Sequence, residues 1–560
     1  MVKFTYHGFQ TAYPEIYKQI WDQNGGVVAV DLETVSLKNR EPLGIGFAPN
    51  EHDAFYFPID SPLLPWHILD DPRIIKLFHN GSFDLGVLKS YFDMDLTSVW
   101  DSIIAAQLQG YPPALSDLAG LMFGDKLMTI EDLIGKKGKN QGLMSDVPLE
   151  KVANKCCQDV KYTQKVWNKL QPNVEWPVFG LEMELLPILV RMEDIGLRID
   201  IDRLLQHRDK VKKDVEFYYG IAKGMGFNPG SSMQTAAVLE SRGWKIRYNR
   251  TTGKPILNEE ILSTVYRDDP ISHLVLAYRK SRVILSTFIN AIFDKHLDGD
   301  RIYPRVNQAV VASGRLSRTQ PNTQNIPVHM RDIFIPSEGN YYEDWDLSQI
   351  ELRVLAYLVW IYTGDYTMQQ VFDSGGDVHN ATSMFIFGDI EPWHRRISKD
   401  INFAVCYRGT AQTLYQRSGV PVAQGQKFMD QYFANYPGIN QFFDIIIQGL
   451  YANGYTSTML GRKRFFPELQ YLDKWGQLRI EREAFNHVIQ GTASEVIKKL
   501  LIRNAWASQC NTVHDSITFD LVPGQVLDRN TALDLAPYRT PMEVKWGMNW
   551  RDLEKLGIWG

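Results

Sequence analysis

The sequence predicts a multidomain protein that combines an α/β part with an α+β part. Its 560 residues are too many for a single hydrophobic core, so about two to four domains are expected. Apolar strands are followed by helical patterns over roughly the first 175 residues, whereas long helical patterns dominate the middle of the chain. Near the C-terminus one long helix precedes a pair of strands. An α/β domain is therefore expected first, and a mixed domain after it.

Composition and charge narrow the class of protein. The chain is 44% hydrophobic and 22% charged, which is typical of a well-packed folded protein. No apolar run approaches the ~18 residues of a membrane span, and the N-terminus reads as neither a signal nor a transit peptide. Four cysteines, including the adjacent Cys156 and Cys157, form no metal-binding spacing and no disulfide framework. We expect an intracellular protein with no membrane partner.

The net charge of −5 neither favours nor excludes binding to nucleic acid, because an acidic body can carry a basic groove. Basic residues are concentrated between about 200 and 340, in "DKVKK", "YRKSR" and "SGRLSR". The imbalance of charge is therefore local.

The first domain carries four acidic residues in suggestive positions. Apolar strands are predicted at 26–36, 41–49 and 53–59, and helices from about 100. Asp31 and Glu33 are two residues apart on the first strand, so their side chains share one face and repel unless a cation or water lies between them. "FHNGSFDLGVL" adds Asp84 and "CCQDVKYT" adds Asp159. Each acid alone reads as a surface residue or a cap. Together they could hold two Mg²⁺ about 4 Å apart, the geometry for attack of water on a phosphodiester.

The rest of the chain is mostly helical, with strands near its two ends. Helical patterns fill 176–300, strands and turns 306–353, and helices most of 354–470. A strand is expected at 331–336 and a helix at 350–362. One long helix covers 476–503. A hairpin-like pair follows at 510–521, and a final strand at 542–546.

Asp346 and Asp515 form a second pair of acids. Asp346 lies where a strand gives way to the helix at 350–362, so it is either a helix cap or a catalytic carboxylate. Asp515 lies at a tight turn between two strands, where a solvated turn residue is the simple interpretation. Between the two acids, "RRISKDINFAVCYRG" spaces two cations and two aromatics four residues apart on one helical face. This pattern suits a surface that binds a triphosphate and stacks on a base; its members are Arg395, Lys399, Phe403 and Tyr407.

These motifs resemble those of family A DNA polymerases, the group of the bacterial repair polymerase large fragment and several phage replicases. "DLSQIELR" and "VHDS" resemble the two catalytic palm motifs, and "RRISKDINFAVCYRG" resembles the fingers-helix motif. "SGRLSRTQPNTQNIP" and "REAFNHVIQGTASE" resemble stretches that face the primer–template. "DLET", "HNGSFDL" and "QD" resemble the three motifs of the linked 3′→5′ exonuclease. The resemblance runs from about residue 27 to the C-terminal "VKWGMNW".

The resemblance implies a fold and its domain boundaries. An RNase H-like exonuclease domain at 1–175 would precede a right-hand polymerase domain. Its thumb would cover 176–305, its palm 306–353 and 471–560, and its fingers 354–470.

The resemblance also implies roles for individual residues. Asp346 and Asp515, with the backbone carbonyl of Leu347, would bind two Mg²⁺, and Asp31, Glu33, Asp84 and Asp159 would do the same in the exonuclease; Mn²⁺ is a possible substitute. Glu351 would be the steric gate against ribonucleotides, and Lys399 would act in catalysis. Nucleotide binding would involve Arg395, Lys399, Phe403, Tyr407, Glu351, His379 and Gln349. Primer–template binding would involve Arg315, Asn325, Arg408, Arg482, Asn486, Gln490 and His514.

Three features depart from the family pattern. Lys155 stands where the exonuclease usually has a water-orienting tyrosine, and Asn154 stands where a related subfamily has histidine. Arg408 stands where the family has glycine after the stacking tyrosine, so it would either contact the template base or merely stiffen its helix. No 5′-nuclease domain precedes residue 1, and the thumb is short, which favours a phage replicase in the cytoplasm of an infected bacterium.

The expected activity is DNA-templated DNA synthesis from dNTPs on a primer–template, by a monomer, with 3′→5′ proofreading. No processivity factor is assigned. One alternative is a polymerase whose exonuclease domain is weak or inactive and serves as a structural DNA clamp, which Lys155 supports. Another is a nuclease whose C-terminal half only binds DNA. That alternative would require the loss of Asp346, Asp515 or Lys399, and all three are present.

Overall fold

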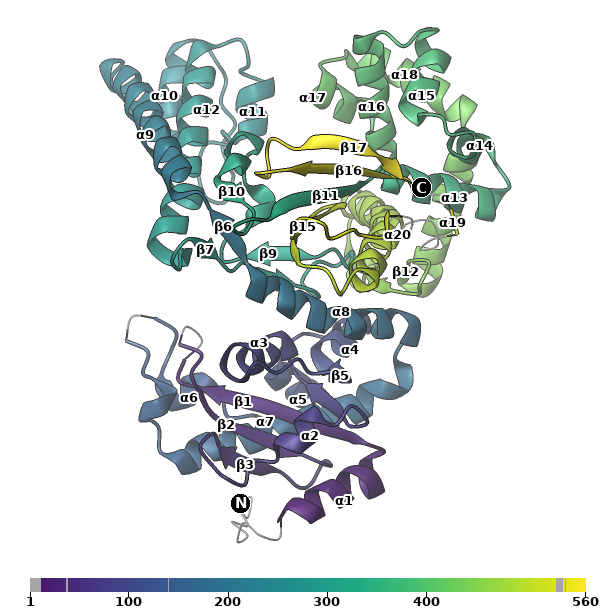
Figure 1. The fold of residues 1–560 in the computed structure, drawn as a ribbon. Coiled ribbons are helices and arrows are strands. Elements are labelled where there is room, and N and C mark those ends of the chain that lie inside the picture. The colour runs from purple at the N-terminus through teal and green to yellow at the C-terminus, as the bar shows by residue number, and fades with distance from the viewer. Residues whose placement is uncertain (1–11, 37–38, 139, 530–536, 539, 560) are drawn as a thin grey trace.

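The computed structural model describes residues 12–36, 39–138, 140–529, 537–538 and 540–559. An α/β domain lies below a larger body in which two helical lobes flank a central sheet (Figure 1). Helix α8 (Trp176–Ile195) runs between the two parts. Within the described residues, no helix combines the length and the apolar character that a membrane span requires.

The N-terminal domain is built on a sheet in the order β3-β2-β1-β4-β5, in which β1 pairs antiparallel with β2 and parallel with β4. Helices cover both faces. The elements are α1 (Ala12–Asn24), β1 (Val27–Thr34), β2 (Pro42–Ala48), β3 (Phe55–Pro58), α2 (Trp66–Asp70), β4 (Ile75–Phe78), α3 (Gly81–Phe92), β5 (Val99–Asp101), α4 (Ser102–Leu108), α5 (Leu115–Phe123), α6 (Ile130–Ile134) and α7 (Leu149–Leu170).

Alternation along β1 decides which side chains face which helices. Val28, Val30 and Leu32 join the core on one face of the sheet, and Val27 and Ala29 join the core on the other. Asp31 and Glu33 continue the second series, on the face that α7 covers. Because alternate side chains of a strand share one face, both acids of β1 face helix α7.

The next lobe is helical and covers the residues for which a thumb is expected. Its elements are β6 (Leu197–Ile199), α9 (Ile201–Gly224), α10 (Ser232–Ser241), α11 (Glu259–Thr264), α12 (Pro270–Val283), the π-helical segments Ile284–Ile289 and Ile292–His296, and β7 (Arg301–Ile302). Helix α9 packs on α12, and its exposed outer face carries Lys210, Lys212 and Lys213.

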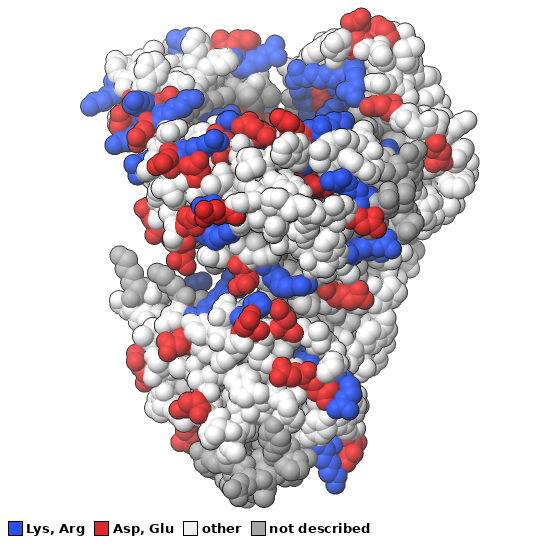
Figure 2. Space-filling view, in the orientation of Figure 1, with Lys and Arg blue, Asp and Glu red and all other residues white. Residues whose placement is uncertain are grey.

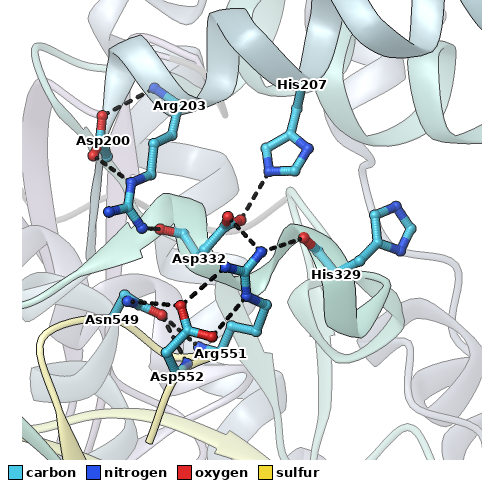
Figure 3. Close-up of polar contacts among 8 residues, drawn as sticks. All are labelled: Asp200, Arg203, His207, His329, Asp332, Asn549, Arg551 and Asp552. Atoms are coloured by element: carbon cyan, nitrogen blue, oxygen red, sulfur yellow. Dashed lines mark hydrogen bonds and ion pairs between the residues drawn. The ribbon is translucent and has the colours of Figure 1, made fainter.

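Asp332 links helix α9 to the C-terminal segment that contains Arg551 (Figure 3). Its carboxylate accepts a hydrogen bond from His207 Nε2 at 2.8 Å and one from Arg551 Nη1 at 2.7 Å. Its backbone carbonyl faces the guanidinium of Arg203, and Arg551 also pairs with Asp552. One acid thus joins three segments that lie far apart in the sequence.

The central sheet is fully antiparallel, in the order β14-β15-β11-β16-β17. Its strands are β11 (Tyr341–Leu347), β14 (Gln509–Val513), β15 (Ser516–Leu521), β16 (Met542–Gly547) and β17 (Glu554–Trp559). Short strands β8 (Arg305–Asn307), β9 (Ser317–Thr319) and β10 (Phe334–Ile335) lead into it.

The second helical lobe follows β11 and covers residues for which the fingers are expected. It contains α13 (Ile350–Thr363), α14 (Thr367–Asp373), α15 (Val378–Phe387), α16 (Pro392–Cys406), α17 (Ala411–Ser418), α18 (Val422–Asn435) and α19 (Pro437–Asn453). The hairpin of β12 (Tyr455–Ser457) and β13 (Lys463–Phe465) leads to α20 (Lys474–Arg503), which returns the chain to the sheet.

Most of the expected elements are present, and three differ. Residues 331–333 end a 3₁₀ segment, Val328–Ile333, and the two-residue β10 follows; the strand that carries Asp346 is β11. Helix α3, which carries Asp84, begins well before the helices expected from about 100. Strand β17 follows the expected final strand. A local pattern does not reveal it, because its exposed, mixed residues form a strand only by pairing with β16.

Helix α8 contributes to three hydrophobic cores. Phe179 and Met183 pack among the residues of α4 and α7. Leu186 joins the opposite core of the N-terminal domain, and Leu185 and Leu189 join the large core shared by the central sheet and the fingers. The helix is therefore a structural part of both domains.

A buried ionic cluster reinforces α8. Glu182, only 1% exposed, pairs with Lys498 of α20 at 2.5 Å and with Arg462 of the β12–β13 loop. Glu495 pairs with Arg462 at 3.3 Å. Attraction from Lys498 and Arg462 overcomes the effect of burial and holds the pKa of Glu182 below its ordinary value.

Removing Glu182 should therefore destabilise the whole chain. Glu182→Ala leaves Lys498 and Arg462 buried with too little negative charge, and the expected loss is about 3–5 kcal/mol in the free energy of unfolding. Urea denaturation measures it. Glu184→Ala, at an exposed position on the same helix, is the control and should change stability by less than about 0.5 kcal/mol. Equal effects of the two substitutions would contradict the role given to the cluster.

Candidate functional site

The first carboxylate cluster is assembled by β1, α3 and α7. Asp31 and Glu33 project from β1, Asp84 lies in the first turn of α3, and Asp159 lies on α7. The backbone N–H of Leu32 donates to Asp84 Oδ1 at 2.9 Å, which fixes α3 against β1. The structure thus brings together all four acids that the sequence singled out.

Burial and mutual repulsion raise the pKa of every carboxyl in this cluster. Burial, with repulsion by Asp159, raises the pKa of Asp31 to about 7. Burial and the charge of Asp31 raise the pKa values of Glu33 and Asp84 well above their ordinary range. The pKa of Asp159 is also raised, chiefly by burial. Such a cluster favours the binding of positive charge.

Lys155 supplies one such charge from within the protein. It lies one helical turn before Asp159 on α7, is 7% exposed, and forms an ion pair with that acid. Burial alone would lower the pKa of Lys155, but Asp159, Glu33 and Asp31 together hold it above its ordinary value. The ammonium group therefore lies beside Asp159 and stays protonated.

Two neighbours of this cluster were missed by sequence reasoning. The thiol of Cys156 lies 3.5 Å from Asp31 Oδ2, and the buried hydroxyl of Tyr56 has no hydrogen-bond partner among the described residues. Glycines at 44 and 46 leave room for them: a Cβ at Gly44 would lie 2.2 Å from the Tyr56 hydroxyl, and one at Gly46 would lie 2.6 Å from the Cys156 sulfur. The signal in the sequence for these two neighbours is the pair Gly44 and Gly46, which lie opposite Glu33 and Asp31 on the adjacent strand.

The second cluster lies at one end of the central sheet. Asp346 is the penultimate residue of β11, and Asp515 lies in the turn between β14 and β15. The backbone N–H of Leu347 donates to the Asp515 carbonyl at 3.1 Å, which holds the two segments together. Asp346 does not cap α13, because the residue at the N-cap position is Gln349. The cap interpretation of Asp346 is therefore wrong.

Burial raises the pKa of both acids. The pKa of Asp346 is raised although Lys545 partly offsets the effect, and the pKa of Asp515 rises to about 6 although Arg315 is close. Arg315 Nη2 lies 3.6 Å from Asp515 Oδ1 and donates to Glu351 Oε1 at 2.5 Å. One guanidinium thus bridges the acid in the turn and the acid on the first turn of α13.

Glu351 also contacts the aromatic end of the candidate nucleotide-binding helix. The hydroxyl of Tyr407 donates to the Glu351 carboxylate, with oxygen–oxygen distances of 3.2 and 3.3 Å. Glu351 is 6% exposed. Tyr407, half-exposed beside it, is the residue that follows the last residue of α16.

Helix α16 presents the predicted series of cations and aromatics. Lys399 is exposed and its Nζ lies 5.8 Å from the centre of the Phe403 ring, which in turn lies 5.9 Å from the ring of His379. Burial lowers the pKa of His379 to about 4, so this imidazole is neutral near pH 7. Arg395, at the start of the series, pairs with Asp377 at 2.9 Å.

Arg408 lies outside the helix that it was expected to stiffen. Helix α16 ends at Cys406, and Arg408 adopts a left-handed conformation with a φ of 48°. Helix propensity therefore does not apply, and the helix-stiffening interpretation is wrong. The positive φ explains why glycine suits this position. The Arg408 guanidinium pairs with Glu481 of α20 at 2.8 Å and lies over the Phe443 ring.

The other candidate DNA-binding residues line two further elements. Arg482, Asn486 and Gln490 are spaced by four along α20, with Arg482 exposed and the Asn486 side-chain amide lacking a partner within the described chain. Asn325 and His514 are exposed, the first in a 3₁₀ turn and the second next to Asp515. In Figure 2, Lys and Arg side chains gather on the upper parts of both lobes. The DNA-binding roles stay predictions.

Comparison with known proteins identifies the family. The profile of DNA polymerase family A matches residues 202–550, and the profile of a 3′-5′ exonuclease matches residues 15–175. The chain belongs to DNA polymerase family A. The two matches cover the central sheet with its lobes and the N-terminal domain, respectively.

Relatives of this family A chain include two bacterial enzymes named DNA polymerase I. The one from Pseudomonas aeruginosa is 28% identical over 549 residues, which cover 88% of this chain and 59% of the relative. The one from Chloroflexus aurantiacus is 31% identical, over 86% of this chain and 55% of the relative. The chain thus spans a little over half the length of these relatives.

A solved structure has the same fold. It is described as the POL domain of Pol1 from M. smegmatis in complex with DNA primer-template and dNTP. It superposes with a TM-score of 0.80 and 24% sequence identity, covering 94% of this chain and 95% of the other.

The donor set of this family A chain fits divalent metal ions. In the first cluster the ligand atoms of Asp31, Glu33 and Cys156 lie within 4.8 Å of one another. Most donors in both clusters are carboxylate oxygens, the ligands that Mg²⁺ prefers. Buried carboxyls with raised pKa values gain most from a cation. The use of divalent metals, general in this family, therefore agrees with the residues present.

The raised pKa of Asp31 leads to a prediction about the free energy of unfolding when EDTA removes metal ions. This pKa is about 7 in the folded chain against an ordinary value of 3.8, so ionised Asp31 destabilises the fold above pH 7 and has no such effect below about pH 4. Asp31→Asn should therefore raise the free energy of unfolding by about 1–3 kcal/mol at pH 8, and by progressively less towards pH 5.

Thermal melts between pH 5 and pH 8 measure this effect. Added Mg²⁺ should raise the melting temperature of the unchanged chain more than that of Asp31→Asn, because the variant has lost a ligand. A stability difference that is the same at pH 5 and pH 8 would contradict the assignment.

Proposed function

We propose that this chain is a DNA-templated DNA polymerase that extends a primer with dNTPs, and that its N-terminal domain is a 3′→5′ exonuclease. The observation that carries the proposal is the second cluster. Asp346 and Asp515 meet at the end of the central sheet, beside a glutamate held by Arg315 and Tyr407 and a helix of cations and aromatics. Membership of the family supports the same function.

Each part of the site has a task in this reaction. Asp346 and Asp515, with the Leu347 carbonyl, would hold two Mg²⁺, which when bound neutralise the triphosphate and activate the primer 3′-hydroxyl. Arg395 and Lys399 would bind the triphosphate, with neutral His379 as a hydrogen-bond donor beside them. Phe403 and Tyr407 would pack against the sugar and base of the incoming nucleotide; Gln349 would lie at its phosphates.

Glu351 would set the preference for deoxyribose. Its carboxylate is fixed by Arg315 on one side and by the Tyr407 hydroxyl on the other. A buried carboxylate that cannot move away would occupy the volume that a ribose 2′-hydroxyl needs. Discrimination would then come from sterics, without a dedicated recognition of the 2′ position.

DNA binding would be spread over the thumb and α20. The exposed lysines of α9 would contact duplex phosphates without reading sequence. Arg315, Asn325, Arg482, Asn486, Gln490 and His514 would contact primer or template near the site, some through minor-groove acceptors that every correct pair presents. The expected partner is a DNA primer–template, on which the chain would act as a monomer.

In the exonuclease domain, Asp31, Glu33, Asp84 and Asp159 would hold Mg²⁺, or Mn²⁺ in its place. The ion pair between Lys155 and Asp159 keeps one alternative in view, a domain with weak or no nuclease activity that acts as a structural clamp on DNA. The phage origin and replicative role expected from the short chain stay predictions.

Substitutions in the two carboxylate clusters should separate the activities. Asp346→Ala or Asp515→Ala removes a metal ligand and should lower primer extension at least about a thousandfold while leaving degradation of single strands unchanged. Asp31→Ala or Asp84→Ala should have the opposite effect. Gel assays with and without dNTPs measure both activities. Near-normal extension by either palm variant would refute the polymerase site, and absence of Mg²⁺-dependent degradation by the unchanged chain would favour the clamp.

Shortening Glu351 should relax sugar selection. Glu351→Ala should lower the ratio of dNTP to rNTP incorporation, expressed as kcat/KM, by about tenfold or more, because the side chain no longer fills the 2′ position. Glu391→Ala, at an exposed glutamate just before α16, is the control and should keep the ratio. An unchanged ratio in Glu351→Ala would mean that another residue forms the gate.

A further inference from the structure

The side chain of Arg408 joins the end of α16 to α19 and α20. Its Nη1 donates to Glu481 Oε2 of α20 at 2.8 Å. Its guanidinium carbon lies 5.4 Å from the centre of the Phe443 ring of α19, a side chain that is 3% exposed. Tyr451, also on α19, donates its hydroxyl hydrogen to Glu481 Oε1 at 3.2 Å. The Glu481 carboxylate is therefore bound through both of its oxygens, and Arg408 supplies one of the two contacts.

The surface that receives Arg408 is rigid. The rings of Phe443 and Phe485 have their centres 4.0 Å apart, and both residues belong to the large core shared by the central sheet and the fingers. Phe485 lies one turn after Glu481 on α20, so the ion pair sits directly beside this packed contact. Residues in such a core have little freedom to move. Arg408 is thus attached to a fixed part of the domain.

Arg408 makes these contacts from a strained backbone. Its φ of 48° is a conformation that glycine adopts freely and that costs free energy for a residue with a Cβ. Strain of this kind persists where the surrounding structure enforces it, and it points to a use for the side chain concerned. Here the side chain has two contacts, with Glu481 and with Phe443. An arginine at this position is therefore explained by what its guanidinium holds.

The residue just before Arg408 reaches the second carboxylate cluster. The Tyr407 hydroxyl donates to the Glu351 carboxylate, at 3.2 and 3.3 Å from its two oxygens. Helix α16 ends at Cys406, so Tyr407 lies outside the regular helix and its place depends on the residues that flank it. With Arg408 attached to α20, the Tyr407 backbone is fixed on both sides, by the helix before it and by the ion pair after it.

We propose that Arg408 is a positioning residue for Tyr407. Its ion pair with Glu481 holds the Tyr407 ring in contact with Glu351, and it thereby sets both the affinity for the incoming dNTP and the selection of deoxyribose. The inference rests on the proposed polymerase function and adds two residues, Arg408 and Glu481, that determine its specificity. Arg408 acts through Tyr407 and contacts neither the nucleotide nor the template base.

Steady-state insertion of single nucleotides by the full-length chain tests this proposal. Arg408→Gly removes the guanidinium and relieves the backbone strain, so the fold is kept. It should raise KM for dNTP by about three- to tenfold while kcat changes by less than about twofold, and the ratio of dNTP to rNTP incorporation should fall. Partial unfolding would lower kcat and leave KM unchanged, so this pattern distinguishes positioning from a loss of structure.

Glu481→Ala should have the same effect as Arg408→Gly, and the double variant should be no worse than either single one, because the two residues act as a pair. Arg408→Lys keeps the charge and should stay close to the unchanged chain. Tyr451→Phe, which removes the other contact of Glu481, and Arg417→Ala, at an exposed arginine of α17, are the controls and should leave KM unchanged.

Three results would overturn the inference while primer extension stands. They are an unchanged KM in Arg408→Gly, effects of Arg408→Gly and Glu481→Ala that simply add in the double variant, and a change in KM that depends on the template base. The last would mean that Arg408 contacts the template directly, so insertion is measured opposite all four bases. Failure of the unchanged chain to insert any dNTP would overturn the proposed function itself, and the inference with it.

Discussion

The concentration of negative charge constrains both sites of this chain. In each site a basic side chain of the protein offsets part of that charge. In the N-terminal domain Lys155 is buried, and it pairs with Asp159 along α7. In the second carboxylate cluster Arg315 is less buried, and its guanidinium bridges Glu351 and Asp515. A planar guanidinium can hold two acids from one side. The two domains therefore offset their negative charge with basic side chains that differ in type and in burial.

Strained backbone conformations occur around the second carboxylate cluster. Three of its residues, Gln349, Arg408 and His514, are not glycine and yet have positive φ values of 55°, 48° and 54°. Gln349 turns the chain from β11 into α13, His514 forms the turn that presents Asp515, and Arg408 lies two residues after the end of α16. Such conformations persist only where the surrounding structure enforces them. Sharp turns thus bring a strand, a hairpin and a helix end to one point.

Local patterns in the sequence were sufficient for the long helices, the hairpin at Asp515 and the strand at Asp31, because periodicity and turn residues determine them directly. Local patterns failed where the structure depends on pairing between strands or on the point at which a helix ends. Strand β17 exists because β16 lies beside it, and Arg408 escapes the helix because α16 ends two residues earlier. The spacing of Lys155 and Asp159 is local, but the contact of Cys156 on the same helix with Asp31 joins segments more than a hundred residues apart.

The three apolar faces of α8 have a consequence for how such a chain could lose or exchange its first domain. A deletion that ends just before α8 would leave Phe179, Met183 and Leu186 without the cores that cover them. The shortened polymerase would then carry an exposed hydrophobic stripe, which promotes association with other molecules. Any descendant without the N-terminal domain must therefore also acquire polar residues along α8, and that pattern would be readable in its sequence.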